Sequence, residues 1–157
     1  MSGIKLTKPQ ILVDKNGIPI AIGITRPGGS DHLHALSIVD QIKILNGRKG
    51  RPRTRPQKLV ADKGYAARGF RNNLRKRSIR HQIPPVKLGG GRNLVHRVLK
   101  GRPITYQPLL YNQRWKVERT IAWFMSFRKI NIYNDCLEHM YIAFCMLAAV
   151  IITLRYF

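Results

Sequence analysis

Acidic residues are scarce in this sequence of 157 residues. Seven Asp and Glu stand against 29 Lys and Arg, so the formal net charge at pH 7 is +22. Such a chain repels itself in the compact state, which makes a nucleic acid or an anionic membrane surface the expected partner. Hydrophobic residues make up 44% of the sequence. This is enough for a core, so we expect one globular domain over residues 1–157 rather than a disordered basic tail.

Cysteine is also rare, and no apolar run is long enough to span a membrane. Cys136 and Cys145 form no CxxC or Cys/His cluster that could hold a metal, which indicates a reducing cytoplasm. The longest apolar run, over 140–154, has 15 residues, whereas a helix that spans a bilayer needs about 20. We interpret this run as a buried helix, with a membrane tail anchor as the alternative. The first ten residues do not resemble a signal peptide.

Patterns along the chain predict an α/β protein. The Asn16-Gly17 pair between two β-rich segments predicts an opening hairpin over 11–13 and 18–24. The further expected elements are a helix from Ser30 or Asp31 to about Gly47, a basic loop over 48–56, a strand over 58–61, a helix over 66–77, a strand over 78–83, a loose connection to about Pro108, and helices over 111–128 and 136–154.

The positive charge is concentrated in the middle third of the chain, residues 48–102, which we name the basic belt. It holds 18 basic residues and one acid, Asp62. Asp62 follows a predicted strand, at the position where α/β proteins place ligand-binding and catalytic groups. The alternative interpretation is that Asp62 caps the next turn or pairs with Lys63 or Arg68.

A second candidate group lies further along the chain. Tyr111, Arg114 and Glu118 have spacings of three and four, which places them on one face of a helix. The alternative is an ordinary Arg114–Glu118 ion pair on a solvated face. The nearby aromatic residues favour a core over a base-stacking platform; they are Trp115, Trp123, Phe124 and Phe127.

These segments together resemble a known family. The run Asp62-Lys63-Gly64-Tyr65 after a short strand, and residues 114–124 (RWKVERTIAWF), resemble the DDE transposases of bacterial insertion sequences, of the insertion sequence five type. Residues 12–19 and 29–32 also resemble that family's hairpin and the helix start after it. The resemblance implies an incomplete ribonuclease H-like fold, with a mixed sheet that begins with a hairpin, flanking helices and a C-terminal helical pair.

The resemblance also implies an activity. In this family three carboxylates hold two Mg²⁺ ions, with Mn²⁺ as a substitute, and the ions cut and join DNA phosphodiesters. Asp62 matches the second acid and Glu118 the third, so both are the expected catalytic and metal-binding residues. The expected DNA contacts are Tyr111, Arg114, Arg75, Lys76 and Arg77.

The sequence departs from the family pattern in two places. The position where related transposases carry a Lys is Met125. The first acid would lie on a strand before the hairpin, and neither Asp14 nor Asp31 matches it. We therefore expect the C-terminal part of a transposase without its N-terminal DNA-binding region and first strand, from a truncated copy or the second of two reading frames. Loss of that central strand would leave unpaired strand edges.

Such a fragment is expected to bind DNA but to be inactive alone, with weak or no Mg²⁺ binding. Its expected partners are insertion-sequence ends, an upstream transposase fragment and a second copy of the chain, in the bacterial cytoplasm at the nucleoid. Two rival hypotheses remain open. One is a non-enzymatic basic nucleic-acid-binding protein, in which binding is indifferent to Asp62 and Glu118. The other is a membrane-surface protein anchored through residues 140–154.

Overall fold

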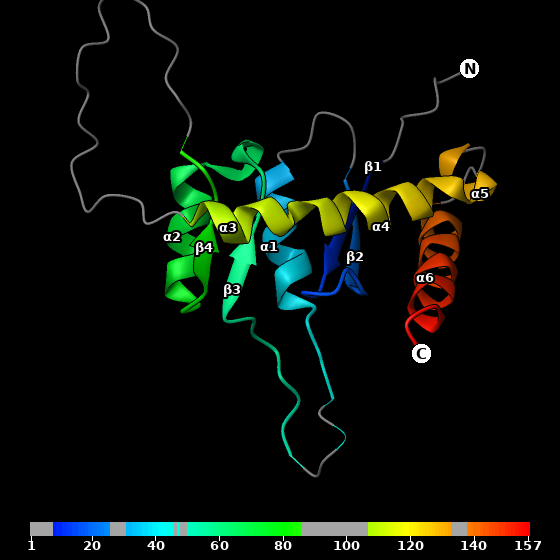
Figure 1. Cartoon of the computed structure of the whole chain (residues 1–157), viewed down its shortest axis with the longest axis horizontal. Helices are drawn as coiled ribbons and strands as arrows, with labels where there is room; N and C mark the ends of the chain where they lie inside the picture. Colours follow the sequence, from blue (N-terminus) through cyan, green and yellow to red (C-terminus); the bar gives the residue numbers. More distant parts are fainter. Residues whose placement is uncertain (1–7, 26–30, 46, 48–49, 86–106, 133–137) are drawn as a thin grey trace, which may run out of the picture.

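Short strands alternate with helices in this chain, so the α/β prediction is confirmed (Figure 1). The computed structural model describes residues 8–25, 31–45, 47, 50–85, 107–132 and 138–157. The strands are β1 (Lys8–Val13), β2 (Pro19–Thr25), β3 (Lys58–Val60) and β4 (Arg80–Gln82). The helices are α1 (Asp31–Asp40), α2 (Arg68–Lys76), α3 (Pro108–Tyr111), α4 (Trp115–Ser126), α5 (Arg128–Asn131) and α6 (Glu138–Leu154), with 3-10 turns at Lys63–Tyr65 and Asn112–Arg114.

The predicted opening hairpin is formed by β1 and β2, which pair antiparallel. The Asp14 carboxylate closes its turn by accepting hydrogen bonds from the backbone N–H groups of Asn16 and Ile18, both at 2.8 Å. Gly17 has a φ of +94°, in the left-handed region that favours glycine. The Asn-Gly prediction is therefore confirmed, and Asp14 has a structural role in the turn.

The second pair of strands, β3 and β4, is parallel, with Leu59 opposite His81, and α2 connects the two strands. This confirms the predicted order of strand, turn, helix and strand. In the described residues no strand joins β1 to β3, so they form two separate two-stranded sheets. The expected hairpin and parallel pair are both present, and within the described residues no further strand pairs with β1 or β3, so the two pairs do not join into one mixed sheet.

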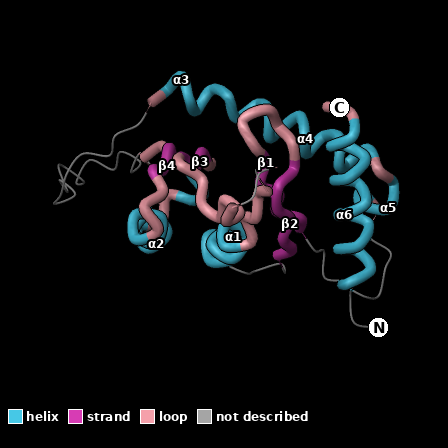
Figure 2. Tube along the Cα trace, turned by 90° about the horizontal axis from the view of Figure 1, so that it is seen from below, coloured by secondary structure: helices cyan, strands magenta, loops and turns pink. Residues whose placement is uncertain are grey.

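The strands form the middle layer of the molecule. Figure 2 shows them in the order β4, β3, β1, β2, with α1 and α2 on one side and α4 on the other. Helix α4 crosses in front of both sheets in Figure 1, and α6 packs beyond β2. A helix that crosses both sheets can connect residues of β3 with residues of the hairpin.

Two apolar clusters stabilise these layers. The first lies among α1, α2 and β3 and consists of Val39, Ile42, Leu59, Phe70, Leu74, Ile79 and Ile83. The second lies among α4, α5 and α6 and consists of Phe124, Ile130, Tyr141, Cys145, Ala148 and Ile152. The hairpin contributes to both, since Leu12 packs on the first cluster and Ile11 on the second. Successive side chains of a strand point to opposite faces, which explains this division.

Two predicted helices have different bounds in the structure. Helix α1 ends at Asp40 rather than near Gly47, because Ile44 instead pairs antiparallel with Arg53 through backbone hydrogen bonds of 2.9 and 3.0 Å. The continuous helix expected over 111–128 is divided into α3, a 3-10 turn and α4. The expected connection over 86–106 and Cys136 lie outside the described residues.

The C-terminal helix is only half buried, so the prediction of a buried helix is wrong for one of its faces. Tyr141, Cys145, Ala148 and Ile152 are buried at helical spacing, whereas Met140, Met146, Leu147, Val150, Ile151 and Leu154 are exposed. Burial raises the pKa of the Cys145 thiol to about 11. Among the described helices, none is both long and apolar enough to cross a membrane.

The aromatic side chains that were expected in the core are partly buried and partly exposed. Phe124 is fully buried, and Trp123 and Phe127 pack against the second cluster. Trp115 is 52% exposed, so the core interpretation is wrong for it. Its ring lies 5.0 Å from the guanidinium of Arg119, which explains how a large aromatic side chain is held at the surface.

Side chains of α4 attach this helix to the hairpin turn. The buried Thr120 hydroxyl donates to the Gly17 carbonyl at 2.7 Å and also lies 3.0 Å from the Lys116 carbonyl. Lys116 donates to the Lys15 carbonyl, and Arg119 to the Asn16 carbonyl, each at 2.8 Å. Three successive carbonyls of the turn are therefore bound by one helix.

Replacing Thr120 with Val should lower the free energy of unfolding by about 1–2 kcal/mol, because the shape is kept while the buried Gly17 carbonyl loses its donor. Thr153→Val is the matched control, since within the described residues the Thr153 hydroxyl donates to the Ala149 carbonyl of its own helix and to no other element. This replacement should cost less than about 0.5 kcal/mol. Urea unfolding followed by circular dichroism measures both. Equal losses in the two variants would contradict this role of Thr120.

Candidate active site at the end of β3

Asp62 lies two residues after β3 and begins a 3-10 turn. One carboxylate oxygen, Oδ1, accepts the backbone N–H of Lys63 at 2.7 Å and the hydroxyl of Tyr111 at 3.2 Å. The capping interpretation of Asp62 is therefore confirmed. The same oxygen also receives a side chain from a distant part of the sequence, which a simple turn cap does not require.

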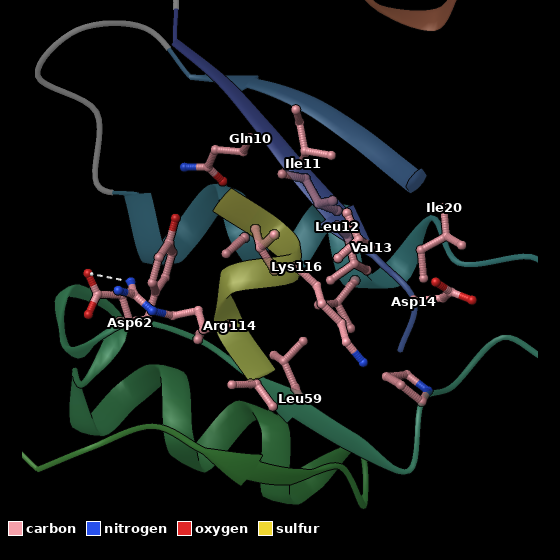
Figure 3. Close-up of a pocket in the computed structure, with 18 of the residues that line it drawn as sticks. Gln10, Ile11, Leu12, Val13, Asp14, Ile20, Leu59, Asp62, Arg114 and Lys116 are labelled. Atoms are coloured by element: carbon pink, nitrogen blue, oxygen red, sulfur yellow. Dashed lines mark ion pairs between the residues drawn. The ribbon is translucent and has the colours of Figure 1, made fainter. Parts of the chain in front are cut away.

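Arg114 connects the two candidate acids. Its Nη1 lies 3.3 Å from Asp62 Oδ2, and its Nη2 lies 2.8 Å from Glu118 Oε1. The Arg114 guanidinium also lies 5.4 Å from the centre of the Tyr111 ring. Figure 3 shows Asp62 and Arg114 facing each other, with the ion pair drawn between them. Asp62 and Glu118, far apart in the sequence, thus share one cation.

Arg114 contacts both Tyr111 and Glu118, although the three residues do not lie on one helix. Tyr111 is the last residue of α3, Arg114 ends the 3-10 turn, and Glu118 lies in the first turn of α4. The prediction that the three residues share one face of a single helix is therefore wrong, because the helix is interrupted by the 3-10 turn between Tyr111 and Glu118. Sequence reasoning assigned Arg114 to DNA and missed its bond to Asp62, because spacing along a helix reveals only the i,i+4 partner.

The site is open to solvent. The side chains of Asp62 and Glu118 are 47% and 58% exposed, and that of Arg114 is 33% exposed. Ion pairs this exposed contribute about 0–1 kcal/mol each, so a ligand with stronger charge can replace them. The alternative partner Arg68 is exposed, and no ion pair between it and Asp62 occurs among the described residues.

These carboxylates fit only part of a two-metal donor set. Aspartate and glutamate oxygens are the ligands that Mg²⁺ prefers in proteins. In the part of the chain that the structure describes, however, no group of three or more His, Cys, Asp or Glu side chains could hold a metal ion. Asp62 and Glu118 therefore provide two ligands, and a two-metal site needs further donors.

The site lies at one end of a cavity of about 570 Å³ that separates the two sheets. Residues 9–13 of β1 line one side, and residues 58–62 line the other. Asp62 and Arg114 lie at one end of this cavity, which we name the β1–β3 groove, and Asp14 lies at the other (Figure 3).

Comparisons with known proteins identify the family. The family model described as Transposase DDE domain matches residues 2–153. The chain belongs to the transposase DDE domain family. It is also 32% identical over 126 residues to a Burkholderia cepacia protein named as a transposase for insertion sequence element IS402. That match covers 80% of this chain and 52% of the relative, so the chain spans about half the relative's length. No solved structure gives a significant match.

The predicted DNA-contact cluster of this transposase domain lies at the end of α2. Arg75 and Lys76 are exposed in the last turn of the helix. Arg77 instead donates to both carboxylate oxygens of Asp40 at 2.8 Å, which holds the pKa of Asp40 below its usual value. Two of the three predicted contacts are thus free of acidic partners within the described residues, and the third joins α2 to α1.

One residue of the basic belt has a structural role that the sequence did not reveal. Arg71 is buried, and its guanidinium donates to three backbone carbonyls, those of Ala66, Ile83 and Pro84. Burial lowers its pKa. Because its donors are used within the protein, Arg71 is not available to bind a phosphate.

A double-mutant cycle tests the link between Asp62 and Arg114 in this transposase domain. Combining Asp62→Asn with Arg114→Gln should give a coupling energy of about 0.5–1 kcal/mol, since the pair is half exposed. The matched cycle of Asp62→Asn with Arg68→Gln should give about zero, because the pair is not in contact. Unfolding free energies measure both cycles, and equal couplings would contradict the observed geometry.

Proposed function

We propose that this chain is the C-terminal part of the catalytic domain of a DNA transposase, which cuts and joins DNA strands at insertion-sequence ends. The observation that carries the proposal is the convergence of Asp62 and Glu118 on Arg114 at the end of β3. Because the chain belongs to the transposase DDE domain family, we assign this pair of carboxylates to metal binding. The hairpin, the parallel strands and the helices on both sides are consistent with an incomplete ribonuclease H-like fold.

The two acids, Arg114 and Tyr111 each have a role in this proposal. Asp62 and Glu118 contribute ligands for a divalent cation, Mg²⁺ or Mn²⁺. Such ions activate the attacking oxygen and stabilise the leaving oxygen in phosphodiester chemistry. Arg114 holds the two carboxylates near each other through its paired N–H donors, and the Tyr111 hydroxyl fixes the orientation of Asp62. Tyr111 and Arg114 are also the nearest groups for a DNA phosphate at the site.

A protein that consists of these 157 residues alone should bind DNA without cutting it. Two acids converge at the site, and two metal ions need a bridging carboxylate as well. The described residues do not supply this third acid beside Asp62 and Glu118. Activity should therefore require a further segment of the transposase.

Strand cleavage tests this proposal. The 157-residue protein with Mg²⁺ or Mn²⁺ should not nick a supercoiled plasmid that carries insertion-sequence ends. Fusion to the parts of the Burkholderia cepacia relative outside the 126 aligned residues should give metal-dependent nicking. Asp62→Asn or Glu118→Gln in the fusion should reduce the rate at least about 1,000-fold, as expected when a metal ligand is lost.

The matched control for cleavage is Asp40→Asn, which removes an acid that pairs with Arg77 away from the site and should leave the nicking rate unchanged. Nicking by the 157-residue protein that disappears on Asp62→Asn would contradict the proposed inactivity. Nicking by the fusion that persists in Asp62→Asn and Glu118→Gln would contradict the assignment of the two acids.

DNA binding by this chain should be mainly electrostatic. The basic belt holds 18 of the 29 basic residues. Each phosphate that a Lys or Arg neutralises releases counterions, so affinity falls steeply as salt concentration rises. The exposed ends of Arg75 and Lys76 lie on α2, on the opposite side of the strands from α4 (Figure 2).

Replacing both Arg75 and Lys76 with Ala should lower the slope of log affinity against log salt by about 2, since each phosphate contact contributes about 0.9. The control pair is Arg128→Ala with Lys129→Ala, two adjacent exposed residues of α5 outside the belt. Arg77→Ala should have a smaller effect on the slope, because Asp40 neutralises Arg77. Fluorescence anisotropy at several salt concentrations measures these slopes. A larger loss in the α5 pair would place the DNA surface elsewhere.

A further inference from the structure

The segment between α1 and β3 extends away from the layers of strands and helices (Figure 1). We name this segment, residues 41–57, the basic arm, because it contains six basic residues and no acidic one. Its two limbs are joined where Ile44 and Arg53 exchange backbone hydrogen bonds of 2.9 and 3.0 Å. A Cβ added at Gly47 or Gly50 would meet no atom within 4 Å, so both positions lie in open space.

The second limb of the basic arm is held in an extended form by its own sequence. Residues 51–56 read RPRTRP, so arginine alternates with proline or threonine. The two proline rings fix φ at about −65°, and a residue before proline is restricted to extended conformations, which constrains Arg51 and Arg55. Arg53 is fixed by its bridge to the first limb. This limb therefore loses little conformational entropy when it binds a partner.

Two arginines of this limb are available to a ligand. Arg51 and Arg53 are exposed, and neither side chain forms a hydrogen bond or ion pair within the described residues. Arg55 instead donates to the Arg77 carbonyl at 3.4 Å, which attaches the base of the arm to the end of α2. In an extended chain alternate side chains point to the same side, about 6.6 Å apart. That repeat corresponds to about two base pairs of DNA at 3.4 Å each.

The minor groove of A·T-rich DNA fits a narrow, extended, arginine-bearing chain. This groove is about 6 Å wide, which is too narrow for a helix. Runs of A·T pairs narrow it further and strengthen its negative potential, which attracts arginine. Gly50, directly before Arg51, has no side chain, so the backbone can approach the groove closely. The wider major groove suits a helix or a two-stranded ribbon, and the two prolines lack the N–H groups that a regular ribbon needs.

We propose that the basic arm binds the minor groove of A·T-rich duplex DNA through Arg51 and Arg53. The arm then gives the chain a preference for base composition, in addition to the phosphate contacts that other residues of the basic belt make. The inference rests on the proposed DNA binding of this chain. It does not depend on metal binding by Asp62 and Glu118.

The test compares three DNA duplexes of equal length and charge that differ only in their central base pairs, which are A·T, G·C or inosine·C. Inosine is guanine without its 2-amino group, so an inosine·C pair resembles A·T in the minor groove and G·C in the major groove. Fluorescence anisotropy with the 157-residue protein, without metal, measures the three affinities. The A·T and inosine·C duplexes should bind at least about fivefold more tightly than the G·C duplex.

Replacing both Arg51 and Arg53 with Lys keeps the charge of the arm. An ammonium group is more strongly hydrated than a guanidinium, so it enters a narrow groove less readily. This variant should reduce the preference for A·T to below about twofold, while its affinity for the G·C duplex stays close to that of the original chain. The matched control is Arg68→Lys with Arg80→Lys, two exposed arginines of the basic belt outside the arm, which should keep the fivefold preference. Circular dichroism checks that both variants are folded.

Three outcomes would overturn the role of the arm while leaving DNA binding by the chain intact. The three duplexes bind equally, or inosine·C behaves like G·C and so places the contact in the major groove, or the Lys variant of the arm keeps the full preference for A·T. Failure to bind any of the duplexes would contradict the proposed DNA binding as well. The cleavage results with Asp62→Asn have no effect on these measurements, so failure of the arm proposal and failure of the catalytic proposal can be told apart.

Discussion

The attachment of α4 to the hairpin turn is the constraint on which the candidate site depends. Thr120, Lys116 and Arg119 bind three successive carbonyls of the turn, so the helix is fixed over the hairpin. The chain before α4 then passes the end of β3, where Tyr111 and Arg114 reach Asp62. In the described residues the two sheets share no strand, so this helix and the two apolar clusters determine how the sheets are placed. The distance between the two acids follows from that placement.

A net charge of +22 overstates the positive surface that is free to bind DNA. Arg71 uses its guanidinium on backbone carbonyls, Arg77 is neutralised by Asp40, and Arg114 is shared by Asp62 and Glu118. Arg119 is held by aromatic rings and the hairpin turn. Arginine suits these positions because its planar group offers several donors in fixed directions. Counting basic residues therefore indicates the partner class, while the structure selects the side chains that remain available to it.

Much of the local structure was predictable because it depends on neighbours in the sequence. The Asn16-Gly17 turn and the strand before Asp62 follow from short-range backbone preferences, and both are present. The bounds of α1 were not predictable, because a pairing between Ile44 and Arg53 replaces its expected last turn. The exposed face of α6 was also missed, since apolar residues on all sides of a helix do not reveal which side has a partner.

For the candidate site, the sequence by itself identified the residues that the structure brings together: one acid in a basic belt, and an Arg and a Glu at fixed spacing. It also determined the family, through patterns spread over nearly the whole chain. Only the tertiary structure decided that Arg114 bonds Asp62 as well as Glu118, and that two strand edges face each other across an apolar groove. The physical reason is that both features arise between segments distant in sequence. Their geometry depends on how helices pack over strands, which local spacing does not encode.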